Sequence, residues 1–344
     1  MEKTCTGSTS SAVTPPAELV RQHSPPPGAF ASAQQSAWVR SLRGSKEPVD
    51  AERAVGVRVE SERIAPGSVA PGVTVFLAGS ECPFTCVYCD LWKYTLDGPT
   101  PAGALPRQLQ TALGEVEDDL RWVKLYNASN FFDSRAVPVE DRDALAELVS
   151  GFETTVVESH PRLIGKSCLD FADRVDGRVQ VAMGLETVHP EALLRLNKEM
   201  SVTDFDRAAE ELLDMGIGVR AFVLVGVPFV EPTEDHEWVV RSVEHAVSIG
   251  VEHVALIPVR DGNGALEQLR HGGEFHPPSL SRLEDALDDT IGLAAIVTAD
   301  LWDLGRFAEC VHCGDDRCER MERMNLSGEN EPRVGCGECG VGSR

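Results

Sequence analysis

Residues 80–94 read SECPFTCVYCDLWKY and bring three cysteines, Cys82, Cys86 and Cys89, into one short aromatic-rich stretch. They follow GVTVFLAGS (72–80), a run of β-branched and apolar residues typical of a buried parallel strand. Three thiolates at the spacing C-x3-C-x2-C can converge on one metal centre because a short loop folds around it. Structural zinc sites usually use two separated C-x2-C pairs, so this spacing favours a four-iron cluster with one iron left open.

Strand-like and helical runs alternate after this loop. The expected strands are residues 122–127, 153–159, 179–187, 218–226 and 252–259. The expected helices are residues 106–116, 140–151, 189–197, 204–216, 234–250 and 280–294, and several of them open at Asp, Ser or Thr and close at Gly. Six βα units predict a parallel sheet covered by helices, built either as an open sheet or as a full or partial barrel.

The predicted strands end in polar stretches. SECPFTCVYC follows the first strand, and YNASNFFD, ESHP, GLET, GVP and RDGNGALE follow the next five in order. In both parallel architectures the binding face lies at the carboxyl ends of the strands. We therefore expect the chemistry of the protein at this end of the sheet.

With its strand, its loop and the aromatic Tyr88 before Cys89, this region resembles the radical S-adenosylmethionine (radical SAM) superfamily. The resemblance covers about residues 70–300 and is nearest to the elongator-type, methylthiotransferase-type and archaeosine-synthesis branch. It implies an α/β fold, a partial (βα)6 TIM-like barrel, and a 4Fe-4S cluster on Cys82, Cys86 and Cys89. It also implies that SAM binds the open iron and is cleaved to a 5′-deoxyadenosyl radical, with Tyr88 near the adenine.

Further SAM contacts are expected at the strand ends by the same resemblance. They are Asn127, Ser129, Asn130, Glu158, Glu186, Gly226 and Arg260. The first three stand where many members carry a Gly-Gly-Glu-like stretch, and their alternative role is a polar turn. Glu186 would accept from an ammonium or a ribose hydroxyl, with a helix cap as the alternative.

The remaining strand-end residues also have two readings. Glu158 and His160 would bind SAM or substrate, and His160 before a proline equally suits a turn. Gly226 would let the backbone approach the adenine, or form a plain turn. Residues 260–264 resemble the stretch where the family binds adenosine by main-chain groups, and Arg260 is the one cation that we expect on a substrate carboxylate.

A second cysteine group lies in the tail, where Cys310 and Cys313 form one C-x2-C pair and Cys336 and Cys339 form another. Two such pairs are typical of a zinc ribbon, and an auxiliary iron-sulfur cluster is the alternative. Between them, residues 315–326 predict a short helix. A loop that follows would turn the chain back to complete one mononuclear site.

The bulk composition limits the partners. The chain has 344 residues, with 32 Lys and Arg against 55 Asp and Glu, and a formal charge of −23. This charge repels a phosphate backbone, so a nucleic-acid partner is not expected. No uncharged apolar run approaches the roughly 18 residues that span a bilayer, and the N-terminus lacks the apolar segment of a secretory signal. We expect a cytoplasmic protein without membrane contact.

Ten cysteines without a secretory signal favour metal ligation in a reducing compartment. Cys168, in an apolar context, is expected to be a buried core thiol, and Cys318 and His312 are spare. Four segments are expected along the chain. They are a disordered tail (1–33), an N-terminal helix and linker (34–70), the radical SAM core (71–300) and a small Cys-rich, zinc-ribbon-like appendage (301–344).

The expected protein is a radical SAM enzyme that acts on a small molecule or a peptide. Its cofactors would be the 4Fe-4S cluster, SAM and zinc, and an electron donor such as flavodoxin or ferredoxin would reduce it. One alternative is an RNA-modifying radical SAM enzyme. Another is a non-catalytic iron-sulfur scaffold or electron carrier, which would bind a cluster but not SAM.

Overall fold

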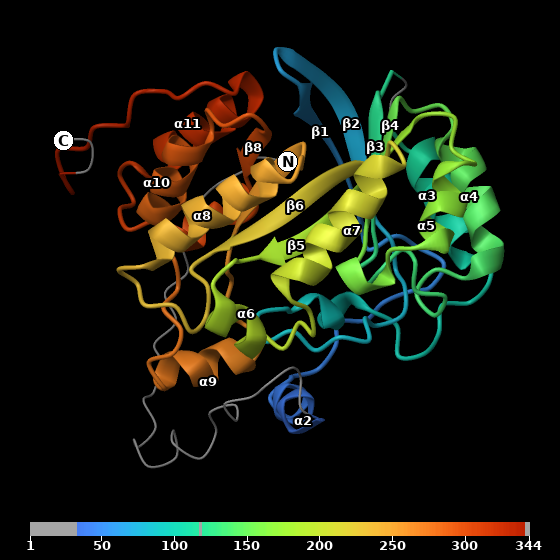
Figure 1. The fold of residues 1–344 in the computed structure, drawn as a ribbon, viewed down its shortest axis with the longest axis horizontal. Helices are drawn as coiled ribbons and strands as arrows, with labels where there is room; N and C mark the ends of the chain where they lie inside the picture. The colour runs from blue at the N-terminus through green and yellow to red at the C-terminus, as the bar shows by residue number, and fades with distance from the viewer. Residues whose placement is uncertain (1–32, 117–118, 341–344) are drawn as a thin grey trace.

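The computed structural model describes residues 33–116 and 119–340, so the predicted tail lies outside the described residues except at its last position. In this part of the chain, eight strands form one sheet whose spatial order follows the sequence. β1 (Gly56–Ala65) pairs antiparallel with β2 (Ser68–Phe76), and the later strands pair in parallel. These later strands are β3 (Trp122–Tyr126), β4 (Thr154–Glu158), β5 (Arg178–Glu186), β6 (Gly218–Val225), β7 (His253–Pro258) and β8 (Ile296–Ala299). The sheet curls into a nearly closed barrel, which confirms the predicted α/β, TIM-like fold (Figure 1).

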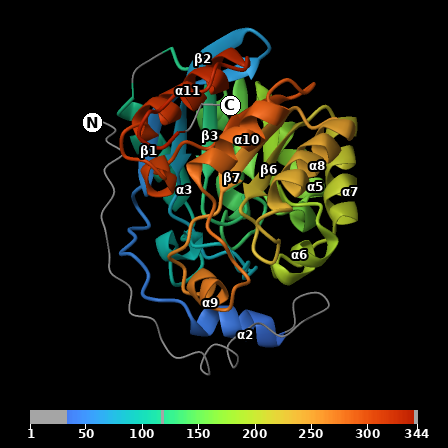
Figure 2. The same ribbon diagram turned by 90° about the vertical axis from the view of Figure 1, so that its left-hand side faces the viewer.

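Helices connect the strands and cover the outside of the barrel. Their bounds are α2 (Ala33–Ser41), α3 (Ala104–Gly114), α4 (Arg142–Val149), α5 (Lys166–Ala172), α6 (Pro190–Arg195), α7 (Val202–Asp214), α8 (Asp235–Ser248), α9 (Ala265–His271), α10 (Leu280–Thr290) and α11 (Gly314–Ser327). Short 3-10 turns occupy Leu91–Tyr94, Val139–Asp141, Pro161–Leu163 and Leu304–Phe307. α2 and α9 lie together at one end of the barrel, and the β1–β2 turn lies at the opposite end (Figures 1 and 2). None of the described helices is long and apolar enough to cross a membrane.

α7 illustrates how the sequence specifies these helices. Ser201 accepts a hydrogen bond from the amide of Asp204, and the Asp204 carboxylate accepts one from the amide of Ser201, which closes a capping box. The buried residues Phe205, Ala208, Ala209 and Leu212 recur at helical spacing on one face. That face packs on the outside of the sheet, so the helix begins and lies where its sequence predicts.

The predicted strands and the observed strands agree best in the middle of the chain. The five strands predicted between residues 122 and 259 match β3 to β7 to within one residue at each end. The expectation that residues 34–70 form only a helix and a linker is wrong in part, because β1 lies within this range. β1 turns the charged residues Arg58, Glu60 and Glu62 toward the barrel, so it lacks the alternating apolar pattern of a half-buried strand. β8, with four residues, and α5 and α9, with seven each, are too short for a periodic pattern and were not predicted.

The interior of the barrel near the amino ends of the strands holds buried charges. Glu62 Oε1 lies 2.7 Å from Arg220 Nη1, and Glu62 Oε2 lies 3.0 Å from Lys124 Nζ. His253 Nε2 lies 2.8 Å from Thr298 Oγ1 in the same layer. Burial raises the pKa of Glu62, but the effect of Arg220 and Lys124, which lower it, is larger. The pKa of Glu62 therefore lies well below the usual value of a carboxyl group. These groups close the barrel at the end opposite to the expected chemistry.

A seam separates β1 from β8, because these two outer strands of the sheet do not pair with each other. Arg63 of β1 donates across it from Nη2 to the carbonyl of Val297, at 3.1 Å. Asn325 of α11 pairs with the edge of β8, since its Nδ2 donates to the carbonyl of Ala299 and its Oδ1 accepts from the Ala299 amide, both at 2.8 Å. The tail therefore helps to close the barrel, and α11 lies beside α10 on its outside (Figure 2).

Candidate active site

The loop that carries Cys82, Cys86 and Cys89 follows β2 at the carboxyl end of the sheet. All three cysteines are free thiols, and burial raises the pKa of each to about 12. Each thiol raises the pKa of another in the group, because the three side chains lie near one another. Thiols with such a raised pKa hold their protons unless a bound metal centre replaces them.

Hydrogen bonds from three directions hold this loop in place. Asn197, which is fully buried, donates from Nδ2 to the carbonyl of Thr85 at 2.8 Å and to its hydroxyl at 2.7 Å. The Thr85 hydroxyl in turn donates to Ser36 Oγ of α2, at 2.8 Å. On the other side, Asn263 Nδ2 donates to the carbonyl of Val87 at 2.7 Å. α2, the segment after α6 and the segment after β7 thus hold the cysteine loop in place.

A buried ion pair lies beside the cysteines. Lys198 Nζ donates to Glu186 Oε1, and it also lies 3.5 Å from the hydroxyl of Tyr88. Both side chains of the ion pair are less than a tenth exposed. Burial alone lowers the pKa of Lys198, but the Glu186 carboxylate raises it above the usual value, so the ammonium stays charged. The pair offers one cation and one carboxylate in a dry setting.

Asn130 connects the loop after β3 to the cysteine loop. Its Nδ2 lies 3.2 Å from Cys82 Sγ, and its Oδ1 accepts from the amide of His160 at 2.7 Å. Near it, Asn127 Nδ2 and Ser129 Oγ are buried and have no hydrogen-bond partner in the described structure. Buried polar atoms are normally satisfied, so these two are free to bind a polar ligand.

Glu158, at the end of β4, lies under the same loop. One of its carboxylate oxygens accepts from the amide of Asn127 at 2.7 Å. Burial raises the pKa of Glu158 to about 7, against the lowering effect of the amides of Asn127 and Ala128. The side chain therefore gains and loses a proton near neutral pH.

His160 has a structural role in this arrangement. Its Nδ1 accepts from the amide of Arg162 at 3.2 Å, so Nε2 carries the hydrogen and donates to the carbonyl of Lys198 at 2.8 Å. Its ring stacks on Phe84 of the cysteine loop, with 3.8 Å between the centroids. Burial lowers its pKa to about 3, so the ring stays neutral. Of its two expected roles, the geometry favours the structural one.

Two expected SAM residues are occupied elsewhere. The amide of Gly226 donates to the Asp235 carboxylate at 3.0 Å, and a Cβ on Gly226 would meet Pro278 at 2.6 Å. Arg260 Nη2 lies 2.9 Å from Asp300 Oδ2 on the segment that follows β8. Among the described residues, neither Gly226 nor Arg260 forms a hydrogen bond or an ion pair with the cysteine loop, so their assignment to SAM stays a prediction.

Some residues of the site were missed by the sequence analysis. Lys198 and Asn197 follow α6 in the run LNKEM, which carries no pattern that marks a buried charge. Asn263 lies in the polar stretch RDGNG, so its location at a strand end was a signal that could have been used.

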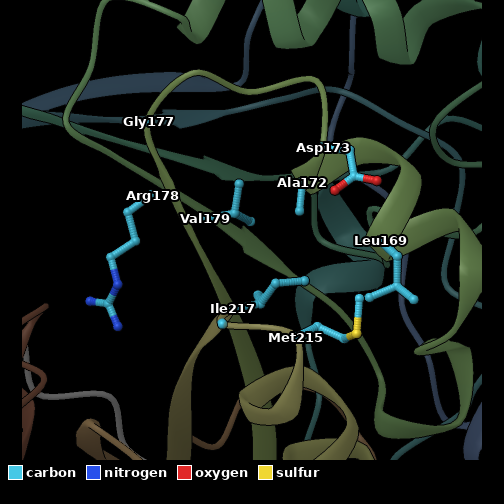
Figure 3. Close-up of a pocket in the computed structure, with 9 residues that line it drawn as sticks. Leu169, Ala172, Asp173, Gly177, Arg178, Val179, Met215 and Ile217 are labelled. Atoms are coloured by element: carbon cyan, nitrogen blue, oxygen red, sulfur yellow. The ribbon is translucent and has the colours of Figure 1, made fainter.

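A cavity of about 160 Å³ lies away from this site (Figure 3). It is lined by the end of α5, the start of β5 and the turn after α7, including Leu169, Arg178 and Met215. The cavity is at the amino end of β5, so it does not belong to the cysteine site.

The tail cysteines also meet in space. The ligand atoms of Cys310, Cys313, Cys336 and Cys339 all lie within 4.8 Å of one another, which places the two predicted pairs at one site. α11 forms where the short helix was expected. Cys168 is fully buried in the core, as predicted.

Comparison with known proteins finds relatives of low sequence identity. No protein-family model matches the chain. An uncharacterized protein from Methanocaldococcus jannaschii is 21% identical over 84% of this chain and 86% of its own length. Archaeosine synthase subunit beta from Methanosarcina acetivorans is 25% identical over 56% of this chain, and the match spans 58% of its own length.

Solved structures with a similar fold include a radical SAM methyltransferase from Sphaerobacter thermophilus. It is 16% identical, with a TM-score of 0.49 over 71% of this chain and 76% of that chain. The fold of this chain is an α/β barrel whose strand-end loop carries three cysteines. The solved proteins that are similar to it include enzymes named as radical SAM methyltransferases.

Proposed function

We propose that this protein is a radical SAM enzyme whose cluster is held by Cys82, Cys86 and Cys89. The observation that carries the proposal is the buried Lys198–Glu186 pair beside three convergent free thiols. When bound, the 4Fe-4S cluster and SAM supply a 5′-deoxyadenosyl radical for hydrogen abstraction. The donor set fits a cluster with one open iron, because three thiolates leave one iron for another ligand.

The residues around the cysteines suit the methionyl group of SAM, which carries an ammonium and a carboxylate. Glu186 would accept from the ammonium and Lys198 would donate to the carboxylate, so the ion pair is complementary to a zwitterion. Asn127 Nδ2 and Ser129 Oγ, both without a partner, would supply further hydrogen bonds. Because the site is dry and its loop is held by Asn197 and Asn263, these groups need little rearrangement on binding.

The substrate that we propose is a small molecule or a peptide, and the reductant is a protein such as flavodoxin or ferredoxin. The formal charge of −23 disfavours a nucleic-acid substrate by long-range repulsion. The two groups of cysteines suit metal ligation, which supports a reducing compartment such as the cytoplasm.

A second candidate, an RNA-modifying radical SAM enzyme, is favoured by the relative named archaeosine synthase subunit beta. The two candidates differ in what the purified protein binds. Co-purified RNA, or RNA binding that weakens steeply with salt, would favour the second candidate. Binding of small molecules or peptides without RNA would favour the first.

The decisive experiment measures SAM cleavage by anaerobically reconstituted, reduced protein. We expect about four irons and four sulfides in the barrel and slow release of 5′-deoxyadenosine. The variant with Cys82, Cys86 and Cys89 all replaced by Ala should lose both. A protein that keeps the cluster but neither binds nor cleaves SAM would instead be an iron-sulfur scaffold or electron carrier.

A further inference from the structure

The tail cysteines form a metal site that is separate from the barrel site. Across residues 33–116 and 119–340, only Cys310, Cys313, Cys336 and Cys339 bring three or more metal-binding side chains within 4.8 Å of one another. The compact tail group has the dimensions of a site for one ion.

The sulfur spacing identifies the kind of centre. Cys313 Sγ and Cys339 Sγ lie 3.8 Å apart. A tetrahedral zinc ion with bonds of about 2.3 Å places its sulfurs roughly 3.8 Å apart, whereas a disulfide bond is only about 2.05 Å long. A four-iron cubane, with its thiolates on four different irons, would hold them farther apart. Among divalent ions, zinc binds thiolates more tightly than iron does.

The two cysteine pairs are built alike. Each reads C-x2-C-G, with Gly314 after Cys313 and Gly340 after Cys339. In the second pair the chain turns back sharply, since the amide of Gly340 donates to the carbonyl of Cys336 at 3.0 Å and Gly340 has a φ of 70°. Backbone amides of this turn also point at the sulfur of Cys336. The geometry suits a thiolate that is bound to an ion.

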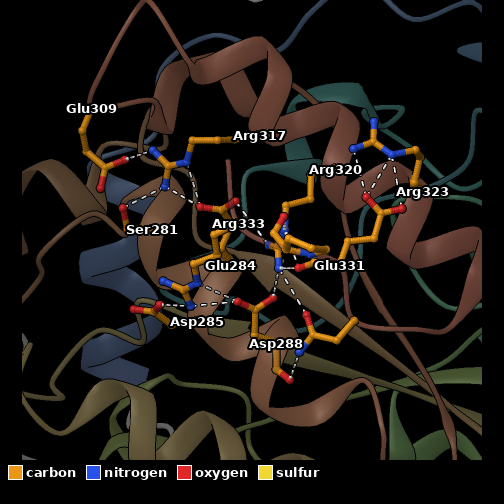
Figure 4. A network of polar contacts seen from close by, with 12 residues as sticks. Ser281, Glu284, Asp285, Asp288, Glu309, Arg317, Arg320, Arg323, Glu331 and Arg333 are labelled. Atoms are coloured by element: carbon orange, nitrogen blue, oxygen red, sulfur yellow. Dashed lines mark hydrogen bonds and ion pairs between the residues drawn. The ribbon is translucent and has the colours of Figure 1, made fainter. Parts of the chain in front are cut away.

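Arginines of α11 and of the segment after it form a network with acidic side chains of α10 (Figure 4). Arg317 and Arg320 of α11 are almost fully buried, and both contact Glu284 of α10, Arg317 at 2.6 Å. Arg320 Nε also donates to the carbonyl of Pro332 at 3.1 Å, and Arg333 lies 2.8 Å from Asp288 Oδ2. The segment between α11 and Cys336 is therefore tied to α10, and it delivers the second pair of thiols beside Cys313.

We propose that one zinc ion is bound by Cys310, Cys313, Cys336 and Cys339. The ion links the segment before α11 to the segment after it, and so holds this helix over the seam of the barrel. Cys313 directly precedes α11, and Asn325 and Gly328 near the end of the helix lie against β8 and Arg63 of β1. The ion would thus join the start of the helix to the segment that returns from its end. It has no part in the barrel chemistry.

Metal analysis of the full-length chain tests the site. We expect one zinc per chain in the natural protein and in the variant that lacks the three barrel cysteines, and less than a tenth of that in Cys339→Ser. Cys339 is the exposed ligand, so its replacement disturbs packing least. The control is Cys318→Ser, which replaces a cysteine of α11 that lies outside the ligand set and should keep its zinc. Iron and sulfide at the tail in the triple variant, iron in place of zinc, or zinc retained by Cys339→Ser would each overturn the proposal.

Hydrogen exchange tests the structural role of the zinc ion in the natural protein, so the result does not depend on whether a variant folds. Removal of zinc from the natural protein by a chelator should speed exchange at least tenfold in residues 308–318 and 334–340. The strands β3 to β7 should be unchanged. Exchange that stays slow in both tail segments after complete zinc removal would show that the ion does not fasten α11.

Discussion

Glu186 is constrained both in its backbone and in its side chain. Its φ is 66°, a left-handed value that costs a residue other than glycine about 1 to 3 kcal/mol, and the register with β6 shifts between Gly184 and Glu186. The side chain folds back over Gly184, where a Cβ would lie 1.8 Å from Glu186 Oε1 and 2.4 Å from Lys198 Nζ. Strain of this kind at a strand end is typical of a binding site, because the surrounding structure must hold it.

Lys198→Met should leave the Glu186 carboxylate buried without a partner. We expect a loss of about 3 to 5 kcal/mol in the free energy of unfolding. SAM affinity should fall at least tenfold, because the cation for the carboxylate is gone. Urea unfolding and equilibrium SAM binding would measure the two effects.

The double variant Lys198→Met with Glu186→Gln separates stability from binding. Removing both charges should restore most of the lost stability, since no uncompensated charge remains. SAM binding should stay weak. If the double variant binds SAM like the natural protein, the ion pair is structural only.

Glu158 should make stability depend on pH near neutrality. Its pKa in the folded protein, about 7, lies above the usual carboxyl value, so the folded form holds this proton more tightly than the unfolded chain does. The stability that it contributes is fully present below the usual carboxyl pKa and is lost as the pH rises toward 7. The loss is on the order of 3 kcal/mol. Glu158→Gln should flatten this part of the stability profile in urea unfolding between pH 4 and pH 8, and an unchanged slope would contradict the buried carboxyl.

At the scale of single elements, the cysteine loop is the least regular part of the site and the most heavily tethered. Its backbone carbonyls bond to the side chains of Asn197 and Asn263, which come from segments far away in the sequence. Asn197 itself has a φ of 56°, and asparagine tolerates this left-handed conformation better than most residues. The loop is therefore ordered by its neighbours and not by helix or strand pairing.

Asn263→Ala should loosen the loop, because the carbonyl of Val87 would be buried without a donor. We expect about 1 to 3 kcal/mol less stability and a lower iron content after reconstitution, with faster cluster loss in air. The matched control is Asn330→Ala, whose side chain also donates to a backbone carbonyl, that of Asp288, but in the tail. Equal iron content in both variants would show that the tether is dispensable.

At the scale of the whole molecule, the barrel combines a polar interior with an apolar shell. Helices pack an apolar layer on the outside of the sheet, while Glu62, Lys124 and Arg220 meet inside it. Burying these charges is costly, and they persist because each has a partner. The seam between β1 and β8 is covered by side chains of α11 in place of strand pairing, so the tail belongs to the folding unit of the barrel.

Glu62→Gln should therefore destabilise the whole barrel, because it leaves Lys124 and Arg220 without their shared carboxylate. We expect a loss of about 3 to 5 kcal/mol in the free energy of unfolding. Glu60→Gln is the control, since Glu60 is more exposed and lies 3.8 Å from Lys124, and its loss should stay below about 1 kcal/mol. Similar losses in the two variants, measured in urea, would contradict a buried network centred on Glu62.

The sequence by itself determined the features that contiguous residues encode. Apolar runs predicted β3 to β7, capping residues and periodicity predicted helices such as α7, and the spacing of Cys82, Cys86 and Cys89 predicted the position of the loop. The two C-x2-C pairs likewise predicted a second group of four cysteines. These patterns are local, so they are visible without the fold.

Only the tertiary structure decided which distant groups meet. It pairs Lys198 with Glu186. Arg260 pairs with Asp300, and the amide of Gly226 donates to Asp235. The ring of His160 stacks on Phe84 and bonds to the backbone of Lys198. The tertiary structure also forms β1 within the expected linker, and it packs α11 of the tail over the seam between β1 and β8. The physical reason is that a buried charge or an edge strand is stable only through a partner, and partners are set by barrel closure, which no local pattern records.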